Sequence, residues 1–539
     1  MVRRRARMLP VALLLTLLSA AATPPFPAGA QASSATSRKA PVNRATPQKA
    51  PVRQPAARRP AAPPAPALRA TTPRNASALA ADLGAIIGAA TRGGEWGAMV
   101  ISLTRGDTLY ALNAGRSMQP ASTMKLMTAA LVLDRFGADH RFETTVLRDG
   151  PLTADGTVHG NLILRGTGDP AFSGRYLPGG PAAAVDILAS LVAGAGVRAV
   201  SGDVIGDASA FEPRLVPAGW KESYLHLAYA APVSALSIND NLVWVTFQPG
   251  SVGGPAQVTF DPSSSGVPLL NSVTTRSGSG SSVSVVRRND GGMEARGWIG
   301  SRAQPRRLQM VISDPAPFTT GAFRDALLRR GIMVAGSATL GVTPPDARPV
   351  AALPSAPLSQ LVSAMNRESI NHFAELLFRN AARGPDLSGI GSATAGDEAL
   401  REFLSSHIGA PANAVVAADG SGLSLMDRLT PRVLTRMLAY AHEAPWGSVF
   451  HASLPVAGES ELLRTRMRRS PAEGNLHAKT GTTDEIIALA GYTTAENGEI
   501  LAFTFIYNGR DRWKAREAID RMGETLSGFA RAGVASVAP

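Results

Sequence analysis

A change in the secondary-structure pattern of the sequence in the middle of the chain limits its possible folds most strongly. From about residue 141 to 345, short β-rich runs such as Gly160 to Leu164 and Leu242 to Phe247 alternate with turns. The flanking segments mix helical and strand patterns. A single domain formed by the segments before and after this stretch would bury both segments around a common core. We therefore expect a first domain part at 75–140, an inserted β-rich accessory region at 141–345 and a second part at 346–539.

Helical patterns occur on both sides of the insertion. Met124 to Phe136 is apolar almost all round, which predicts a buried helix, and Gly137 stands where that helix would end. Ser77 is a suitable N-cap for the first predicted helix. The other predicted helices are Ala78 to Ala90, Leu358 to Asn366, Phe373 to Ala382 and Arg512 to about Ala532.

Strands near both ends of the folded chain predict one antiparallel sheet. Trp96 to Leu103 and Thr108 to Leu112 are joined at Arg105-Gly106-Asp107, a turn signal. Near the other end, Ile486 to Thr493 and Ile500 to Tyr507 are joined through Asn497-Gly498, a hairpin signal. We expect an α/β (α+β) fold with three layers, in which helices cover both faces of an antiparallel sheet.

The first 74 residues have a different character. Residues 1–32 combine an arginine-rich start, an apolar run and a small-x-small site at Ala30-Gln31-Ala32. This pattern predicts a secretory signal peptide and export to the periplasm or cell-wall space, and an uncleaved anchor is the alternative. Residues 33–74, rich in Pro, Ala and Arg, predict a disordered linker. No later stretch is long and apolar enough to span a membrane.

The formal net charge of +13 belongs to this N-terminal segment. Residues 1–74 hold 13 Lys and Arg and no acid, so 41 basic residues face 41 acidic residues in the remainder. A basic linker favours loose contact with membrane or wall polymers, and the neutral remainder argues against a nucleic-acid partner. The chain has no cysteine, which excludes disulfides, thiolate metal sites and a cysteine nucleophile.

Ser122 and Lys125 lie three residues apart at the start of the predicted buried helix, and this spacing puts both side chains on one face. A serine hydroxyl needs a base to become a nucleophile. A lysine amine can be that base when burial and nearby cations lower its pKa. The helix N-terminus also offers N–H groups to a developing oxyanion. We predict Ser122 as nucleophile and Lys125 as its base.

Lysine usage supports this prediction. The chain has 6 lysines among 54 basic residues, and four of them, Lys125, Lys221, Lys479 and Lys514, follow the linker. Arginine serves wherever a fixed charge suffices, but it cannot deprotonate. The alternative is that these lysines are compositional leftovers. Two of the four lie in short motifs, which favours a functional role.

Two further motifs follow the insertion. Ser369-Ile370-Asn371 precedes a predicted helix, and the alternative to a catalytic role is an ordinary N-cap. Lys479-Thr480-Gly481-Thr482 precedes the Ile486 strand. A lysine and two hydroxyls suit a substrate carboxylate, and Gly481 allows a close backbone approach. The alternative is a polar strand entry.

The order Ser-x-x-Lys, Ser-x-Asn, Lys-Thr-Gly resembles the serine penicillin-recognising enzymes, which are penicillin-binding proteins and serine β-lactamases. Ser369 follows Ser122 by 247 positions, which leaves room for the insertion. The chain therefore resembles the low-mass class C penicillin-binding proteins, the D-alanyl-D-alanine carboxypeptidase and endopeptidase family (peptidase family S13). Other phrases similar to that family are Pro120 to Lys125, Gly166 to Pro170, Ser234 to Ser237, Asp419 to Ser424 and Leu454 to Gly458.

This resemblance implies a transpeptidase domain like that of penicillin-binding proteins and β-lactamases, with two accessory domains, one nested in the other. It implies a serine-type D-Ala-D-Ala carboxypeptidase or DD-endopeptidase that acts on peptidoglycan stem peptides through an acyl-enzyme on Ser122. β-Lactams would be covalent inhibitors, and neither cofactor nor metal would be needed. A serine β-lactamase and a non-catalytic wall-binding protein are the alternatives. The oligomeric state and the balance of the two activities stay open.

The resemblance also implies roles for the remaining motif residues. Ser369 would relay a proton to the leaving amine, and Asn371 would position Lys125 and the substrate amide. The backbone N–H groups of Ser122 and Thr482 would form the oxyanion hole. The substrate-binding residues would be Lys479, Thr480, Gly481 and Thr482.

One departure concerns specificity. Many family members carry an acidic residue about five positions before the aromatic that corresponds to Tyr229, where it would meet a side-chain amine of the substrate. This chain has Tyr224 there and Glu222 two residues earlier. Either the substrate peptide is recognised differently, or Glu222 takes the place of the acidic residue found in those family members.

Two other kinds of site, a metal site and a Ser-His-Asp triad, have partial matches in the sequence. His372 and Glu375 have a spacing found in metal sites, but no further ligand completes one, and a surface or capping role is favoured. His477 is expected only to flank the active site. Ser421 lies in Gly420-Ser421-Gly422, which we interpret as a turn, and no Gly-x-Ser-x-Gly elbow supports a Ser-His-Asp triad.

Overall fold

The computed structural model describes residues 69–288 and 290–531. The predicted signal peptide lies outside these residues, as does most of the predicted linker. The linker's last residues are nevertheless held: Thr71 Oγ1 donates to Asp82, and Ala530 N–H donates to Pro73. We propose that the folded part begins a few residues before the predicted boundary at residue 74. None of the helices in the described residues has the length and apolar character needed to cross a membrane.

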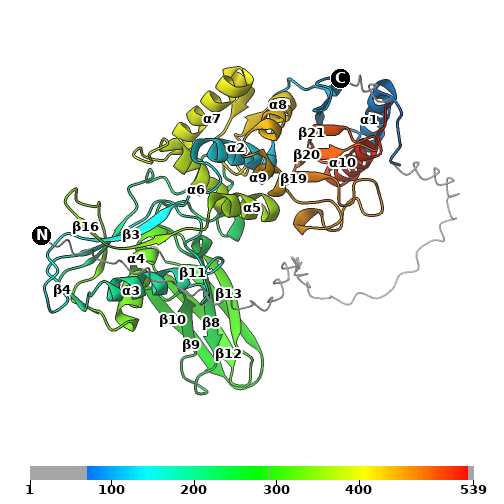
Figure 1. The fold of residues 1–539 in the computed structure, drawn as a ribbon. Helices are drawn as coiled ribbons and strands as arrows, with labels where there is room; N and C mark the ends of the chain where they lie inside the picture. The colour runs from blue at the N-terminus through cyan, green and yellow to red at the C-terminus, as the bar shows by residue number, and fades with distance from the viewer. Residues whose placement is uncertain (1–68, 289, 532–539) are drawn as a thin grey trace, which may run out of the picture. The chain divides into compact units, whose positions relative to one another are not determined.

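Ten α-helices occur in the described residues (Figure 1). They are α1 Ala76–Ala90, α2 Met124–Phe136, α3 Ala183–Gly194, α4 Pro315–Arg329, α5 Leu358–Glu368, α6 Asn371–Ala382, α7 Ala393–Ile408, α8 Pro431–Glu443, α9 Gly447–Ala452 and α10 Arg512–Ser527.

The strands before and within the insertion are β1 Glu95–Ser102, β2 Thr108–Leu112, β3 Glu143–Arg148, β4 Thr157–Val158, β5 Leu162–Arg165, β6 Ala199–Val200, β7 Val204–Asp207, β8 Leu242–Gln248, β9 Gln257–Asp261, β10 Leu269–Arg276, β11 Ser281–Arg287, β12 Met293–Gly300, β13 Arg306–Val311, β14 Met333–Val334, β15 Ala338–Leu340 and β16 Arg348–Pro354. The later strands are β17 Val415–Val416, β18 Arg428–Leu429, β19 His477–Thr482, β20 Ile486–Thr494 and β21 Ile500–Asn508.

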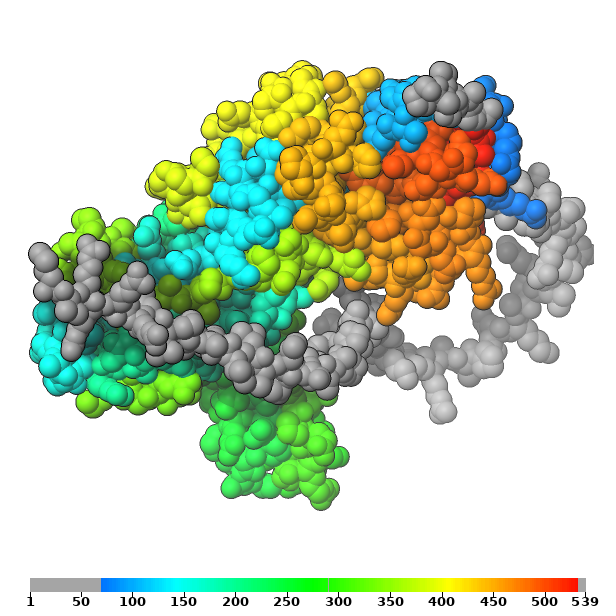
Figure 2. Space-filling view, viewed as in Figure 1, coloured from blue at the N-terminus to red at the C-terminus, as the bar shows by residue number. Residues whose placement is uncertain are grey.

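One sheet joins the two ends of the folded chain, as the strand patterns predict. Its order is β19-β20-β21-β1-β2, and every neighbouring pair is antiparallel. Gly498 in the β20–β21 hairpin has φ +82°, a left-handed conformation that glycine adopts without penalty. Blue α1 lies beside orange-to-red β20, β21 and α10 in Figure 1, and Figure 2 shows blue and red atoms gathered on the same part of the surface.

Helices cover both faces of this sheet. Ile487 and Leu489 of β20 share a core with α1 and α10, whereas Ala488 and Ala490 share another core with α2 and α8. Successive side chains of a strand point to opposite faces, so this alternation shows a covered sheet. Eight of the nine residues of β20 are buried for that reason.

The ends of the predicted helices differ in detail. Asn75, and not the predicted Ser77, caps α1: its side chain accepts from Ala78 N–H, and Ser77 lies inside the helix. α2 has the predicted bounds, and Gly137 with φ +77° follows it. α10 ends at Ser527, before the predicted Ala532, because Gly528 forms its C-cap.

The insertion contains more helix than predicted. Its main sheet has the order β15-β7-β5-β3-β16, with both parallel and antiparallel pairs, and α3 and α4 share its core. β16 pairs with β3 although it begins at Arg348, beyond the predicted end at residue 345. We propose that the insertion extends to Pro354.

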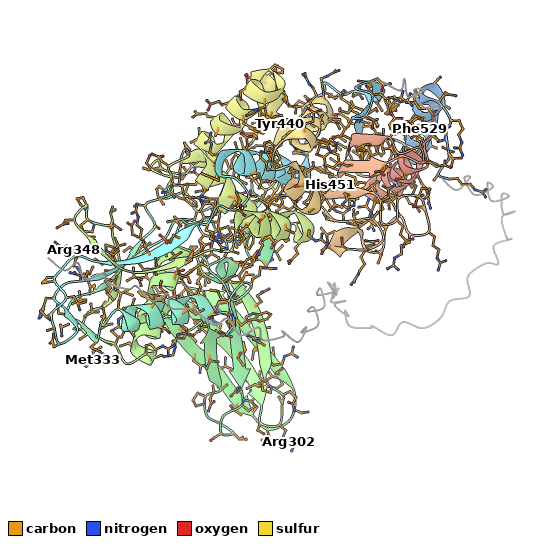
Figure 3. All side chains as sticks on the ribbon, in the orientation of Figure 1. Arg302, Met333, Arg348, Tyr440, His451 and Phe529 are labelled. Carbon is orange, nitrogen blue, oxygen red and sulfur yellow. The ribbon has the colours of Figure 1, made fainter. Side chains whose placement is uncertain are left out.

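A second region lies within the insertion, between residues 242 and 311. Its two three-stranded sheets, β13-β8-β9 and β10-β12-β11, share a core that includes Phe247 and Ile299. Figure 3 labels Arg302 in this region and Met333 and Arg348 on β14 and β16. This nesting supports the proposal of two accessory domains.

Candidate active site

Ser122 lies in a single 3₁₀ turn, Ala121–Thr123, that leads directly into α2. The preceding Ala121 has φ +46°, a conformation that costs a non-glycine residue about 1–3 kcal/mol. Such strain persists only where the surroundings fix the backbone. Here the Thr123 hydroxyl donates to the Pro120 carbonyl across the turn at 2.7 Å. The turn therefore fixes Ser122 at the N-terminal end of a buried helix.

Lys125 is completely buried, and its amine makes three contacts. Nζ lies 3.0 Å from Ser122 Oγ and donates to Asn371 Oδ1 at 2.6 Å and to the Ser421 carbonyl at 2.7 Å. The last two partners are acceptors, whereas a serine hydroxyl can also donate. A neutral amine matches this set: two N–H groups meet the acceptors, and the lone pair faces the serine hydroxyl.

Burial lowers the pKa of Lys125 to about 8, because a low-dielectric interior disfavours the ammonium form. The charges of Asp419, Glu375 and Asp427 oppose this shift by favouring the ammonium. About a tenth of the amine is therefore neutral at pH 7, far more than for an exposed lysine. The surroundings thus give Lys125 the property that a base for Ser122 needs.

The second motif occupies the junction of two helices. Ser369 is the C-cap of α5 and has a left-handed φ of +60°, and Asn371 is the first residue of α6. Neither side chain caps a helix, so the alternative of an ordinary N-cap is wrong. The Asn371 amide instead links Lys125 to the insertion, because its Nδ2 donates to the Tyr229 carbonyl at 2.8 Å.

The third motif forms edge strand β19. Lys479 is completely buried, and its Nζ donates to Ser369 Oγ at 2.8 Å and to the Thr480 carbonyl at 2.9 Å. Burial, together with the positive charge of Lys125, lowers the pKa of Lys479 well below its ordinary value. Thr480 is buried and Thr482 is exposed at the end of the strand.

Glycine at 481 allows this strand to reach the nucleophile turn. A Cβ at that position would lie 2.8 Å from the Pro120 carbonyl oxygen and 3.2 Å from Ala121 Cβ. The first distance is too short for any other side chain without a backbone shift. The three predicted motifs therefore meet: Lys125 contacts Ser122 and Asn371, Lys479 contacts Ser369, and Gly481 packs against Ala121.

The sequence did not reveal the Ser421 carbonyl as a partner of Lys125. The predicted turn exists, and Gly422 in it has φ +82°. A Cβ on Gly422 would lie 1.8 Å from the Ala121 carbonyl oxygen, so the turn is packed against the nucleophile's neighbour. Two glycines around a serine predict a turn, but they do not indicate which carbonyl it presents.

The acidic group near Tyr224 comes from an unexpected place. The Tyr224 hydroxyl donates to Asp484 Oδ2 at 2.6 Å, and Lys221 Nζ donates to the same oxygen at 2.7 Å. Tyr224 also packs edge-on against Tyr229, with ring centroids 5.6 Å apart. Glu222 is exposed, and none of the side-chain hydrogen bonds in the described residues involves it. Asp484, just beyond the third motif, was not predicted.

The histidines and Glu375 require one correction. His372 and Glu375 are 5% and 0% exposed, so the surface role is wrong, and Glu375 Oε1 accepts from Gly420 N–H at 3.0 Å. His477 is half-buried in β19 and packs against His451, with ring centroids 4.4 Å apart. Within residues 69–288 and 290–531, no group of three or more His, Asp or Glu side chains is arranged to hold a metal ion.

Known proteins share both sequence and fold with this chain. A D-alanyl-D-alanine carboxypeptidase of Actinomadura sp. (strain R39) is 34% identical over 462 residues, which cover 82% of this chain and 83% of that protein. The D-alanyl-D-alanine carboxypeptidase DacB of Haemophilus influenzae is 25% identical over 426 residues, covering 77% of this chain and 86% of that protein.

The crystal structure of penicillin binding protein 4 (dacB) from Haemophilus influenzae has a TM-score of 0.69 at 22% identity, covering 82% of this chain and 98% of that one. A second structure of it, complexed with a novel β-lactam, has a TM-score of 0.65 at 22% identity, covering 83% and 98%. These likenesses confirm the predicted fold. Residues 79–528 match the family described as D-Ala-D-Ala carboxypeptidase 3 (S13). The chain therefore belongs to this peptidase family.

Proposed function

We propose that this protein cleaves the D-alanyl-D-alanine bond of peptidoglycan stem peptides through an acyl-enzyme on Ser122. The contact of 3.0 Å between Lys125 Nζ and Ser122 Oγ carries the proposal, because it joins a nucleophile to a buried amine with a lowered pKa. Membership of a D-Ala-D-Ala carboxypeptidase family supports the substrate class.

Acylation begins when the neutral amine of Lys125 takes the hydroxyl proton of Ser122. The serine oxygen bonds to the carbonyl carbon of the penultimate D-alanine, and negative charge develops on the carbonyl oxygen. The backbone N–H groups of Ser122 and Thr482 would stabilise this oxyanion, an effect commonly worth about 3–4 kcal/mol for each donor. The C–N bond then breaks as the proton taken up by Lys125 passes through Ser369 to the leaving amine, which leaves Lys125 neutral for the next step.

Lys479 would bind the substrate's terminal carboxylate with Thr480 and Thr482. Its contact of 2.8 Å with Ser369 Oγ supports this role, because it lies beside the hydroxyl proposed to protonate the leaving amine. A substrate carboxylate would also restore the ammonium form that burial disfavours. Asn371 would position Lys125 and the substrate amide, and Gly481 would let the substrate backbone approach closely.

Water then attacks the acyl-enzyme, with Lys125 as the base, and releases Ser122. β-Lactams would acylate Ser122 in the same way, since their strained amide mimics the scissile bond. The β-lactam complex of the Haemophilus influenzae relative supports this expectation. Export through residues 1–32 would bring the protein to its wall substrate, and the basic linker would contact membrane or wall polymers.

Labelling with a fluorescent penicillin tests the assignment of the nucleophile. The wild type should be labelled and Ser122→Ala should not, with thermal melting of both as the control for folding. Label on the alanine variant would refute the proposal. Slow release of the acyl-penicillin would argue against a serine β-lactamase.

Incubation with a stem pentapeptide and a cross-linked dimer would show which activity dominates. Free D-alanine reports carboxypeptidase activity, and release of monomer reports endopeptidase activity. Wall binding with neither product would favour a non-catalytic protein.

A further inference from the structure

Five consecutive backbone N–H groups, those of residues 418–422, all donate to buried carboxylates. We call these carboxylates, Glu375, Asp419 and Asp427, the acid cage; each is 0% exposed. Burying three carboxyl groups is unfavourable unless each is well satisfied. The contacts are Asp427 Oδ1 with Ala418 N–H at 2.8 Å and Asp419 N–H at 3.2 Å, Glu375 Oε1 with Gly420 N–H at 3.0 Å, and Asp419 Oδ1 with Ser421 N–H at 2.8 Å and Gly422 N–H at 2.6 Å.

With its N–H groups turned to the acid cage, this segment presents carbonyls to the nucleophile helix. The Ser421 carbonyl accepts from Lys125 Nζ at 2.7 Å, and the Gly420 carbonyl accepts from Thr128 Oγ1 at 2.7 Å. Lys125 and Thr128 lie three residues apart on one face of α2. The segment is therefore held between the acid cage on one side and the base of the reaction on the other.

Asp419 is the centre of this arrangement. Besides its two backbone contacts, its Oδ2 accepts from Ser424 N–H and from Trp220 Nε1, each at 2.7 Å. Four donors therefore surround the two carboxylate oxygens, which offsets the cost of burying them. Its charge is the first of three that favour the ammonium form of Lys125.

We propose that Asp419 is a positioning residue for acylation. It fixes the 418–422 segment so that the Ser421 carbonyl holds the Lys125 amine against Ser122. Its negative charge also stabilises the ammonium that Lys125 becomes when it takes the serine proton. This inference rests on the proposed role of Lys125 as the base.

The other two members of the acid cage differ from Asp419. Burial raises the pKa of Glu375 to about 8, with the charge of Asp419 adding to the effect and Arg379 and Lys125 opposing it. Burial likewise raises the pKa of Asp427 well above its ordinary value. Both groups act on the 418–422 segment as hydrogen-bond acceptors, through Oε1 of Glu375 and Oδ1 of Asp427. The charge of Lys125 also acts on Lys479: burial, and then this charge, lowers the pKa of Lys479.

The test compares Asp419→Asn, Glu375→Gln and a control, Asp207→Asn. Asp207 is matched to Asp419: it is 1% exposed, and it accepts from Ser209 N–H and Thr343 N–H in the insertion. The acylation rate by fluorescent penicillin is followed between about pH 6 and 10, with thermal melting of each variant.

Asp419→Asn should acylate about 100-fold more slowly, within the range found for the loss of acid–base catalysis. The acid limb of its remaining activity should move to lower pH, because loss of a negative charge favours the neutral amine of Lys125. Glu375→Gln should lose less activity and move this limb less, because Asp419 is the first of the three charges that act on Lys125. Asp207→Asn should melt earlier but acylate at the wild-type rate.

An unmoved acid limb in Asp419→Asn, or an equal loss of rate in Asp207→Asn, would overturn the inference. If Asp419→Asn does not fold, Thr128→Val decides, because it removes only the hydroxyl that donates to Gly420. Slower acylation with an unmoved limb is then expected, and a wild-type rate contradicts the inference. An unlabelled wild type, or label on Ser122→Ala, would instead refute the proposed function itself.

Discussion

The two completely buried lysines of the active site differ in the charges around them. Lys125 lies on α2 and faces three carboxylates, whereas the charge that acts on Lys479 of β19 is the positive one of Lys125. Burial lowers the pKa of both. The first lysine is therefore balanced, so that it can take up and release a proton. The second is a buried amine without an acidic partner among the described residues, which suits the binding of a substrate anion.

Arginine at each position should separate these two roles with the largest effect. Lys125→Arg should reduce acylation by about 1,000-fold or more, because a guanidinium cannot accept the serine proton. Lys479→Arg should lose only about 10- to 100-fold, since arginine keeps the positive charge but fits the buried site poorly. Labelling rates with a fluorescent penicillin measure both. Substantial activity in Lys125→Arg would rule out Lys125 as the base.

The pH dependence should reveal the same difference. Lys125 acts in its neutral form, so acylation should rise as pH increases through its pKa of about 8. Lys479 acts in its charged form, so the rate should fall again at higher pH, and Lys479→Arg should lose this alkaline limb while keeping the acid limb. Rate measurements across this range on folded variants test the assignment. An alkaline limb that persists in Lys479→Arg would assign it to another group.

Replacing Lys479 should lower the acylation rate but raise the free energy of unfolding. Lys479→Met should raise the free energy of unfolding at pH 7 by roughly 1–3 kcal/mol, because it removes an amine that binds a proton in the unfolded chain and resists it when buried. Lys125→Met should give no such gain, because it leaves Asp419 without its cation. Urea unfolding of the two variants measures the difference. A larger gain in Lys125→Met than in Lys479→Met would contradict the contrast.

The sign of the pH effect on stability follows from the lowered pKa. The pKa of Lys479 is 10.5 in the unfolded chain, which therefore binds a proton there below that pH, whereas burial disfavours this proton in the native state. The free energy of unfolding therefore falls as the pH falls toward the folded-state pKa. Lys479→Met should therefore flatten the rise in stability as the pH increases toward about 10.5. An unchanged slope would mean that Lys479 is charged in both states.

The sequence predicted features that depend on a local pattern. α2 is apolar on every side, so its bounds and burial could be read directly, and the β20–β21 hairpin followed from strand propensity around Asn497-Gly498. The three motifs were also visible, because each is a short string with a chemical purpose. Their meeting in space could not be derived from any one string, and only their order, through a family resemblance, indicated it.

What escaped prediction depends on tertiary contacts. The Ser421 carbonyl reaches Lys125 because the acid cage holds its segment, and the cage draws members from α6 and from a loop about 45 residues later. Glu375 was given a surface or capping role because no further ligand completed a metal site, and its complete burial depends on tertiary contacts that the spacing does not show. The helices α3 and α4 were overlooked because the short strands around them dominate the pattern of the insertion.

A third lysine, Lys221, provides the test with the smallest expected effect. Unlike the two buried lysines, it is partly exposed and forms an ion pair. Its side chain and that of its partner Asp484 are 35% and 60% exposed. Asp484→Asn should therefore change the free energy of unfolding by less than about 1 kcal/mol. The neighbouring Glu485→Gln is a matched control, since Glu485 also forms a surface ion pair, with Arg510.

The two variants should differ in substrate preference. Lys221 lowers the pKa of Asp484, so this carboxylate stays charged and can accept a substrate ammonium in exchange for Lys221. Asp484→Asn should reduce, a few-fold, the kcat/KM ratio between a stem peptide with a free side-chain amine and the same peptide acetylated there. Glu485→Gln should keep the wild-type ratio. An unchanged ratio in Asp484→Asn would show that the acid beside Tyr224 only ties β19 and β20 to the insertion, and that the substrate amine is met by another group.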